Sequence, residues 1–282
     1  MNYNNMHTFV ILAYKESKYL NDCIKSVINQ SVKSNIVIAT TTDNSFIRKL
    51  ARKYNIDIVI GKHSNIGGDF DFAVNTGKTK LVTVAHQDDL YDYDYAKTVI
   101  DEYNKNNSAT IIFTDYYEIR ENKKIYRNNN LRIKKILLFP LRFRKLSGLK
   151  FIKRLTLKFG NSICCPAVTF VKNNCPDEIF KSEYTSNVDW FAWEKLSRIK
   201  GKFIYNRKCL MGHRISTEST TTDIINQGIR TTEDFELLCK FWPKFLAKFI
   251  NMCYKKSEKS NSILNKRKSN WNTLLFLVQY VM

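Results

Sequence analysis

The chain has 282 residues, of which 44% are hydrophobic and 13% aromatic, which suffices for a large packed core and excludes an intrinsically disordered protein. Lys and Arg number 46 against 26 Asp and Glu, and the net charge of +20 predicts an anionic partner such as nucleic acid, acidic lipid or a phosphorylated substrate. No run reaches the roughly 20 apolar residues of a membrane-spanning helix, and the seven cysteines form no CxxC pair, so we expect a cytoplasmic protein with reduced thiols.

Strands and helices alternate along the first 120 residues. Compact apolar runs predict strands over residues 9–13, 36–39, 56–60 and 109–114. The run Leu81–Ala85 is apolar or β-branched throughout, which is typical of a strand buried on both faces of a sheet. Between the strands, apolar residues recur at helical spacing. This alternation predicts βαβ units and therefore an α/β fold with a mainly parallel central sheet flanked by helices.

Polar residues follow the strands where ligands bind in such sheets, at their carboxyl ends. Thr40–Ser45 follows the second strand, and Asn65–Asp69 follows the third with paired glycines that would allow a positive φ or the close approach of a ligand. His86–Asp89 follows the central strand. Its adjacent carboxylates suit a divalent cation carrying a phosphate. A polar turn whose Asp caps the next helix is an equally good interpretation of these residues alone.

The character of the sequence changes after Glu121. Leu149, Ile152, Leu155 and Phe159 recur at helical spacing with Lys150, Lys153, Arg154 and Lys158 between them. This pattern predicts either a basic amphipathic helix at a membrane surface or a helix that packs its apolar face on the core. A second basic region, residues 255–268, precedes an apolar end, Leu274–Met282. We therefore divide the chain into residues 1–121, residues 122–221 with the basic amphipathic insertion, and a helical basic C-terminal region, residues 222–282.

The order of these motifs resembles the family-two glycosyltransferases, which have the GT-A fold. The resemblance is strongest in Val10–Gln30, with the pattern V-I-L-A-Y-x-E-x-x-Y-L-x-x-C-I-x-S-V-x-x-Q, and resumes from Cys165–Phe170 through Arg214. It implies that a nucleotide-diphosphate sugar binds at the strand ends. The residues that it assigns to this donor are Ala13, Tyr14 and Glu16 in the nucleoside pocket, Asp43 as acceptor of a hydrogen bond from the base, and Gln87 at the ribose or a phosphate oxygen.

The same resemblance implies a metal ligand and a general base. The family's DxD motif is His86-Gln87-Asp88-Asp89 here, with His86 in place of the first Asp, so Asp88 takes the role of ligand to Mg²⁺ or Mn²⁺. The diphosphate and water would supply the other ligands. Asp189, near the start of a Trp-rich segment, takes the position of the base. As an alternative, Asp189 is the N-cap of that helix, and His213 is either a functional residue or a buried hydrogen-bonded histidine.

Together these assignments imply an inverting transferase that moves a sugar to a hydroxyl of a saccharide or lipid-linked saccharide, in the synthesis of cell-surface polysaccharide or lipid-linked glycan. The departures at His86 and Val188 keep open a catalytically inactive member that binds nucleotide sugar or glycan. A sugar-phosphate nucleotidyltransferase would need a Gly-rich loop in place of Ala13–Glu16, and a nucleic-acid partner would need a recognition motif that is missing from the sequence. We expect the basic segments to hold the protein against the anionic inner face of the membrane.

Overall fold

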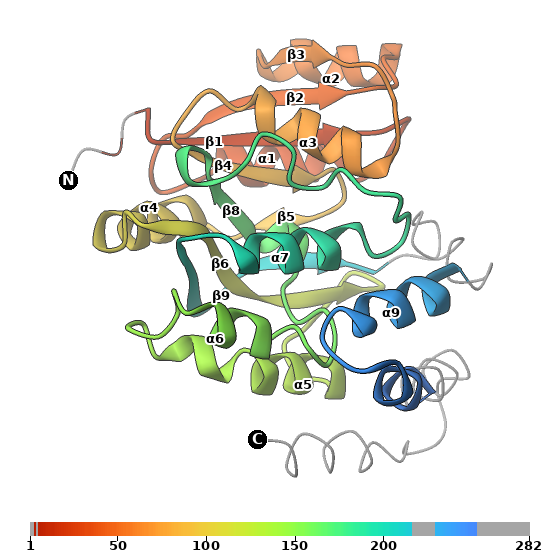
Figure 1. The fold of residues 1–282 in the computed structure, drawn as a ribbon. Helices are drawn as coiled ribbons and strands as arrows, with labels where there is room; N and C mark the ends of the chain where they lie inside the picture. The colour runs from red at the N-terminus through yellow and green to blue at the C-terminus, as the bar shows by residue number, and fades with distance from the viewer. Residues whose placement is uncertain (1–2, 4, 216–228, 253–282) are drawn as a thin grey trace.

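The computed structural model describes residue 3, residues 5–215 and residues 229–252 (Figure 1). Within these residues a nine-stranded sheet has the order β3-β2-β1-β4-β8-β6-β9-β5, with β7 paired to β6. The strands are β1 (His7–Ala13), β2 (Asn35–Thr40), β3 (Asp57–Ile60), β4 (Leu81–His86), β5 (Leu90–Tyr91), β6 (Ala109–Arg120), β7 (Lys123–Ile125), β8 (Val168–Val171) and β9 (Lys202–Arg214).

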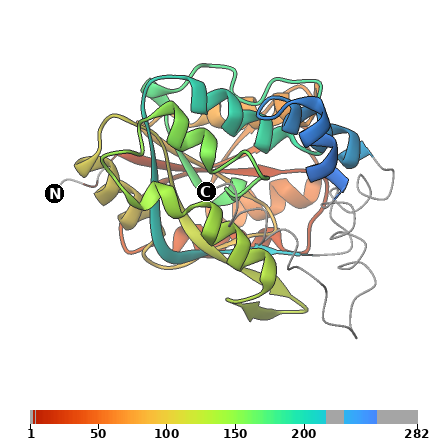
Figure 2. The same cartoon turned by 60° about the horizontal axis from the view of Figure 1, so that its bottom comes forward.

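Helices cover both faces of this curled sheet (Figure 2). They are α1 (Leu20–Ile28), α2 (Ser45–Tyr54), α3 (Ile66–Thr76), α4 (Tyr95–Lys105), α5 (Asn129–Leu137), α6 (Lys150–Leu155), α7 (Val188–Arg198) and α9 (Ile229–Cys239), with 3-10 turns η1 (Phe139–Arg142), η2 (Cys165–Ala167) and η3 (Lys172–Asn174). Residues 244–252 are also helical. The predicted α/β class is confirmed.

The sheet is mixed because β8 lies antiparallel between β4 and β6. β3, β2, β1 and β4 are parallel, as are β6 and β9. Side chains alternate along β1: Val10 packs in the core cluster with α3 and α7, whereas Phe9 and Ile11 pack with α1, α2 and α4. β4 lies between β1 and β8, and its first five residues are buried. It is therefore the doubly buried central strand that the sequence predicted.

The paired glycines lie in a helix, and the prediction of a glycine loop with positive φ is wrong. α3 begins at Ile66, and the Asn65 side chain accepts a hydrogen bond from the Gly68 amide at 2.7 Å. Neither glycine has a positive φ. A Cβ built on Gly67 would lie 2.4 Å from the Phe180 carbonyl oxygen. Gly67 therefore permits the close approach of a neighbouring backbone segment.

The predicted amphipathic helix over Leu149–Phe159 is reduced to the six residues of α6, and its charges are largely internal. The buried Lys153 ammonium donates to the carbonyls of Ile199 (2.7 Å) and Gly201 (3.0 Å), which follow the end of α7. Arg154 pairs with Glu194 of α7 and donates to the Lys240 carbonyl at 2.7 Å. The expectation that all four basic side chains form an outward face is therefore wrong for these two.

The described part of the C-terminal region is attached to the core. Leu237 and Leu238 of α9 are fully buried in the cluster that includes α7. The Trp242 indole donates to the Lys158 carbonyl at 2.7 Å. No helix among the described residues is long and apolar enough to cross a bilayer. The basic region 255–268 and the apolar end Leu274–Met282 lie outside the described residues.

Candidate functional site

The carboxyl ends of β1 and β4 are joined by a side chain that the sequence assigned to the ligand. Gln87 accepts a hydrogen bond from the Tyr14 amide at 3.0 Å and donates to the Tyr14 carbonyl at 2.9 Å. Both of its polar groups therefore pair with the backbone that follows β1. Ala13 is buried as the last residue of β1, whereas Tyr14 and Glu16 are exposed in the loop beyond it. In this structure Gln87 positions the β1 loop.

The loops after β1 and β2 are also tied to each other. Lys15 has a left-handed backbone (φ 54°), and its amide donates to the Thr42 hydroxyl at 2.5 Å. Next to it, the predicted base-binding Asp43 accepts two hydrogen bonds from Arg48 Nε (2.9 and 3.1 Å) and one from its terminal nitrogen (2.5 Å). Arg48 therefore orients the Asp43 carboxylate at the start of α2, where it is partly exposed.

A carboxylate that the sequence analysis did not assign lies beside these loops. Oδ2 of Asp69, in the first turn of α3, contacts His63 Nδ1 at 2.8 Å and accepts a hydrogen bond from the Thr41 hydroxyl at 3.1 Å. Its other oxygen, Oδ1, is buried without a hydrogen-bond partner among the described residues. The His63 ring lies 6.4 Å from that of Tyr14. Only the helix start at Asn65, missed from the sequence, would have indicated that Asp69 turns toward β2.

The two adjacent aspartates after β4 have different environments. Asp89 is fully buried and accepts a hydrogen bond from the Arg214 amide at 2.8 Å, with His213 Nδ1 at 3.2 Å. Arg214 in turn donates through Nε to the Asp88 carbonyl at 3.0 Å, and its guanidinium lies 4.0 Å from the centre of the Tyr19 ring. Asp89 therefore links the end of β9 to the residues after β4, and these hydrogen bonds account for its burial.

The Asp88 carboxylate, by contrast, accepts no hydrogen bond from another side chain in the described part of the chain. Burial, together with the neighbouring charge of Asp89, raises the pKa of Asp88 to about 6. Burial lowers the pKa of His86 to about 4, so this imidazole is neutral, and its Nε2 is buried without a partner among the described residues. Burial lowers the pKa of His213, but Asp89 and Asp88 outweigh it and raise the pKa overall.

These groups fit a divalent cation that is held jointly with a ligand. A partly buried carboxylate with a raised pKa and an unpartnered imidazole nitrogen at the same strand end are both suited to a cation. Among residues 3, 5–215 and 229–252, no group of three or more His, Cys, Asp or Glu side chains is arranged to hold a metal ion. A metal at Asp88 would therefore take most of its ligands from a bound diphosphate and water.

The predicted base, Asp189, lies in the first turn of α7. Its Oδ1 accepts a hydrogen bond from the Trp190 amide at 2.8 Å, and its Oδ2 accepts one from Asn161 Nδ2 at 2.6 Å. Asn187 holds the N-cap position, so the alternative that Asp189 is the N-cap is wrong. Burial raises the pKa of Asp189, although the bonds from Asn161 and Trp190 and the charge of Lys134 partly offset this rise. Asp189 is thus a carboxylate with increased basicity.

A carboxylate from α9 holds the backbone that leads into α7. Glu233 accepts hydrogen bonds from the amides of Thr185 (2.7 Å), Ser186 (2.8 Å) and Asn187 (2.8 Å). Asp234 accepts another from the Asn187 side chain at 2.7 Å. The start of α7, and with it Asp189, is therefore positioned by α9.

The charge of Asp89, after β4, and the charge of Asp189, in α7, both affect the Cys164 thiol. Burial raises the pKa of Cys164, and the charges of both Asp89 and Asp189 add to the rise. Lys134, which the sequence analysis did not single out, lies 5.3 Å from the centre of the Tyr116 ring, and the Tyr116 and His213 ring centroids are 6.1 Å apart. Asp189 and the residues after β4 therefore face one region of the molecule.

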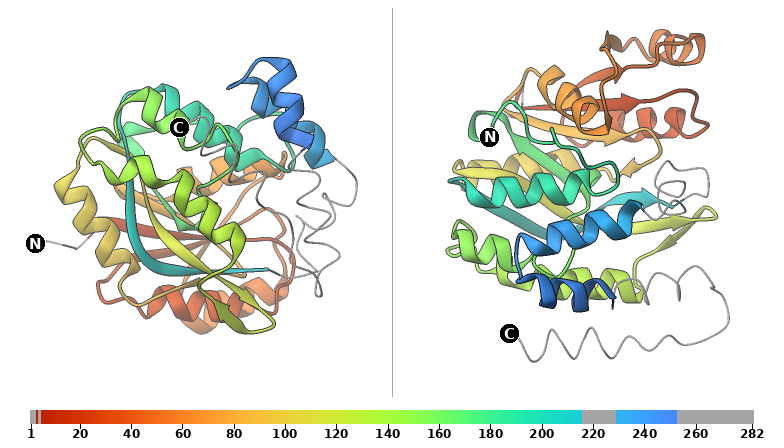
Figure 3. Two further views of the ribbon diagram at one scale, coloured as in Figure 1. Left: turned by 90° about the horizontal axis from the view of Figure 1, so that it is seen from below. Right: turned by 45° about the vertical axis from the view of Figure 1, so that its right-hand side comes forward.

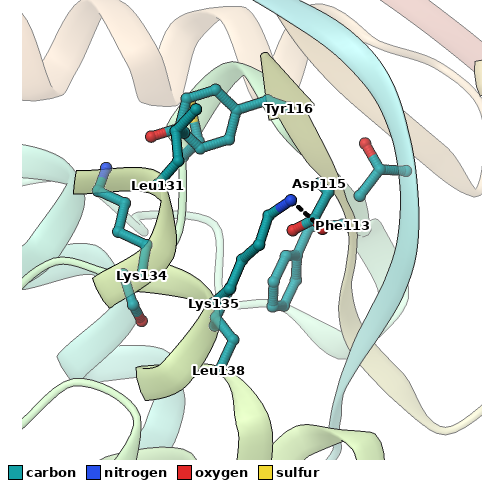
Figure 4. Close-up of a pocket in the computed structure, with 10 residues that line it drawn as sticks. Phe113, Asp115, Tyr116, Leu131, Lys134, Lys135 and Leu138 are labelled. Atoms are coloured by element: carbon teal, nitrogen blue, oxygen red, sulfur yellow. Dashed lines mark ion pairs between the residues drawn. The ribbon is translucent and has the colours of Figure 1, made fainter. Parts of the chain in front are cut away.

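A small hollow, open to solvent, lies in this region (Figure 4). Lys134 and Lys135 of α5 line it opposite Tyr116 and Asp115 of β6, and Lys135 pairs with Asp115 at 3.3 Å. Thr114, whose hydroxyl is buried without a partner among the described residues, also lines it. The hollow is therefore polar on two sides.

Comparisons with known proteins bear on the family and the fold. The model of the family described as glycosyl transferase family 2 matches residues 8–175. A comparison with curated proteins found no match. The crystal structure of residues 1–349 of S. aureus TarS has a TM-score of 0.55 at 10% identity and covers 87% of this chain and 69% of that chain. The same fragment in complex with UDP-GlcNAc gives a TM-score of 0.53 at 10% identity, covering 89% and 72%. At these identities the similarity shows the fold alone.

Proposed function

The chain belongs to glycosyl transferase family 2 and has the GT-A fold, and on that premise we propose that it is an inverting, metal-dependent glycosyltransferase. It moves a hexosyl or related group from a nucleotide-diphosphate sugar to a hydroxyl of a saccharide acceptor. One observation carries the proposal: a carboxylate without a side-chain partner, Asp88, and a carboxylate of raised pKa, Asp189, both lie around the region of Cys164 and His213.

In this proposal the donor lies across the carboxyl ends of β1, β2 and β4. Ala13, Tyr14 and Glu16 line the nucleoside pocket, and Asp43, oriented by Arg48, accepts a hydrogen bond from the base. Asp69 is added to this set because its buried Oδ1 has no partner among the described residues. The TarS structure with UDP-GlcNAc supports a donor of the nucleotide-diphosphate sugar class.

Asp88 holds the metal, Mn²⁺ or Mg²⁺, with His86 Nε2 as a candidate second contact. When bound, the metal supplies positive charge that stabilises the departing diphosphate. The protein's own contribution is to keep the Asp88 side chain available: Asp89 takes the bonds to β9, and Gln87 takes the bonds to the β1 loop. A module that only binds nucleotide sugar or glycan would also need an available Asp88 side chain. A catalytically inactive family member therefore stays the second candidate, favoured by His86 at the first position of the DxD motif.

Asp189 acts as the general base. It takes the proton of the acceptor hydroxyl while that oxygen attacks the anomeric carbon from the face opposite the diphosphate; the bond to the diphosphate breaks and the configuration inverts. The bonds from Asn161 and from the Trp190 amide hold the carboxylate in one orientation. A raised pKa makes it a stronger base than a solvent-exposed aspartate.

The acceptor is proposed to be a saccharide or lipid-linked saccharide of cell-surface polysaccharide synthesis. It would enter from the side of residues 122–221, which supply α5 and α7, while residues 1–121 bind the donor. The high positive charge supports an acceptor held at the anionic inner face of the membrane.

The proposal is tested by screening nucleotide sugars for slow hydrolysis in Mn²⁺, followed by transfer assays on Asp88→Asn and Asp189→Asn. We expect Asp88→Asn to weaken donor binding in Mn²⁺ but not in EDTA. We expect Asp189→Asn to lower transfer by roughly 10²–10⁴-fold with donor affinity unchanged. Asp57→Asn, a change at the exposed first residue of the edge strand β3, is the matched control. Donor binding without any turnover would favour the binding module, and transfer within a few fold of wild type in Asp189→Asn would remove it as the base.

A further inference from the structure

Eight of the 18 large apolar side chains that are exposed in the described residues come from two short stretches of the chain, residues 142–151 and 244–252. The first includes Phe143 (54% exposed), Leu149 (53%) and Phe151 (72%), and the second includes Phe245 (72%) and Phe249 (44%). Both stretches lack acidic residues, since none occurs between Glu121 and Asp177 or between Glu236 and Glu258. Exposed apolar side chains that gather in this way mark a surface for contact with another phase or molecule.

The first stretch is a run of tight turns with exposed apolar side chains. Successive turns close with hydrogen bonds from the Phe143 amide to Pro140, from Leu146 to Phe143 and from Leu149 to Leu146. Phe143, Leu146 and Leu149 are exposed at these turns, while Ser147 between them is fully buried and its carbonyl accepts a hydrogen bond from the Phe203 amide of β9.

The second stretch is a helix whose outer face is apolar. Phe245, Phe249 and Met252 follow at spacings of four and three, so they lie on one face of helical residues 244–252, and all three are exposed. The opposite face, with Ala247 and Ile250, is buried. A helix that turns one apolar face to the core and another to the outside is unusual for a solvated surface.

Both stretches lie along the same side of the molecule, and both carry positive charge. Figure 1 and the right-hand view of Figure 3 place α5, α6 and helical residues 244–252 along the lower side, and the Trp242 indole donates a hydrogen bond to the Lys158 carbonyl between them. The exposed basic residues between the apolar ones are Arg142, Lys145 and Lys150 in the first stretch and Lys244 and Lys248 in the second. Apolar side chains with interleaved lysine and arginine complement an anionic lipid bilayer.

We infer that the surface formed by residues 142–151 and 244–252 docks the protein on an anionic bilayer, with Phe143, Leu146, Phe151, Phe245 and Phe249 entering the headgroup region. This lower surface replaces the outward face of α6 that the sequence predicted, because Lys153 and Arg154 are engaged inside the protein. The inference rests on the proposed function and deepens it, since it adds the surface that would contact the membrane, but vesicle binding needs neither donor nor turnover.

The test is co-sedimentation of the full chain with vesicles of phosphatidylglycerol and phosphatidylcholine in a one-to-three ratio. We expect Phe245→Ser with Phe249→Ser to lower the partition coefficient by roughly tenfold or more for each residue. We expect Lys244→Gln with Lys248→Gln to lower it roughly fivefold for each lysine. The matched control is Ile60→Ser, a change at an exposed apolar residue (52%) on the edge strand β3 at the opposite side.

Donor hydrolysis in solution, without vesicles, confirms that each variant is folded. If the wild type hydrolyses no donor, the proposed function is refuted, but the docking surface is still tested by vesicle binding. Three results would overturn the inference: wild type that does not bind the vesicles, apolar variants that bind as the wild type does, or equal binding to pure phosphatidylcholine. Conversion of a wild-type dimer to a monomer by Phe245→Ser with Phe249→Ser would overturn it too, by assigning the surface to a second copy of the chain.

Discussion

Glu233 should control acceptor chemistry although it lies on a helix far along the chain from the strand ends. Its carboxylate accepts hydrogen bonds from three successive backbone amides, residues 185–187, directly before α7. Hydrogen bonds to a charged group contribute about 1.5–3 kcal/mol each. Thr185 is exposed and water can replace one of these bonds, so we expect Glu233→Ala to lower the free energy of unfolding by about 3–4 kcal/mol.

The conservative variant separates charge from shape. Glu233→Gln keeps one oxygen, which can serve Ser186 and Asn187, but places an NH₂ group against the Thr185 amide, so we expect about half of the loss. Urea denaturation measures both changes, with Thr232→Ala, at an exposed position on the same helix, as control, expected within about 0.5 kcal/mol of wild type. In the folded fraction, transfer should fall while donor affinity stays constant. A loss of stability below about 1 kcal/mol for Glu233→Ala would refute the assigned role.

Two further predictions concern pH. Because burial raises the pKa of Asp189, the rate of transfer should decline on the acid side as that carboxylate takes up a proton. The charge of Lys134 lowers the pKa of Asp189, so Lys134→Met should move the decline to higher pH. A pH–rate profile unchanged by Lys134→Met would contradict an effect of Lys134 on Asp189. Burial lowers the pKa of Lys153 to about 8, so between pH 8 and the ordinary lysine pKa the unfolded chain binds more protons than the folded one. The free energy of unfolding of wild type relative to Lys153→Met should therefore rise by up to about 3 kcal/mol across this pH window in urea titrations. A free-energy difference between the two proteins that does not change with pH would refute this prediction.

Much of the fold could be predicted from local patterns. The strands of residues 9–13, 36–39 and 56–60 appear as β1, β2 and β3 with small shifts at their ends, because their hydrophobic runs are short and clearly bounded. The fifth strand was predicted to end at Thr114, but β6 continues to Arg120. Its continuation is polar in sequence and is stabilised by pairing with β7 and with the distant β9, a contact that no local pattern encodes.

The failures share a physical cause. The sequence around α6 has the correct period for an amphipathic helix, but a period cannot distinguish a lysine that faces solvent from one that binds the carbonyls at the end of another helix. Lys153 does the second, across 46 residues of sequence to Ile199. The prediction for Gly67 failed for the same reason: its missing side chain leaves room for the distant Phe180 carbonyl, which no local pattern indicates.

The adjacent aspartates after β4 show most clearly what sequence alone could and could not assign. Both could be placed at the carboxyl end of the central strand, and a resemblance could select Asp88 as the metal ligand. The structure adds the reason that the two carboxylates are not interchangeable: Asp89 is fully buried and receives the Arg214 amide, a contact across 125 residues. It helps to join the end of β9 to the residues after β4, so a cation that displaced it would leave the Arg214 amide without this acceptor. Asp88, one peptide bond earlier, has no such bond to lose, and a cation can therefore recruit it without any change in the fold.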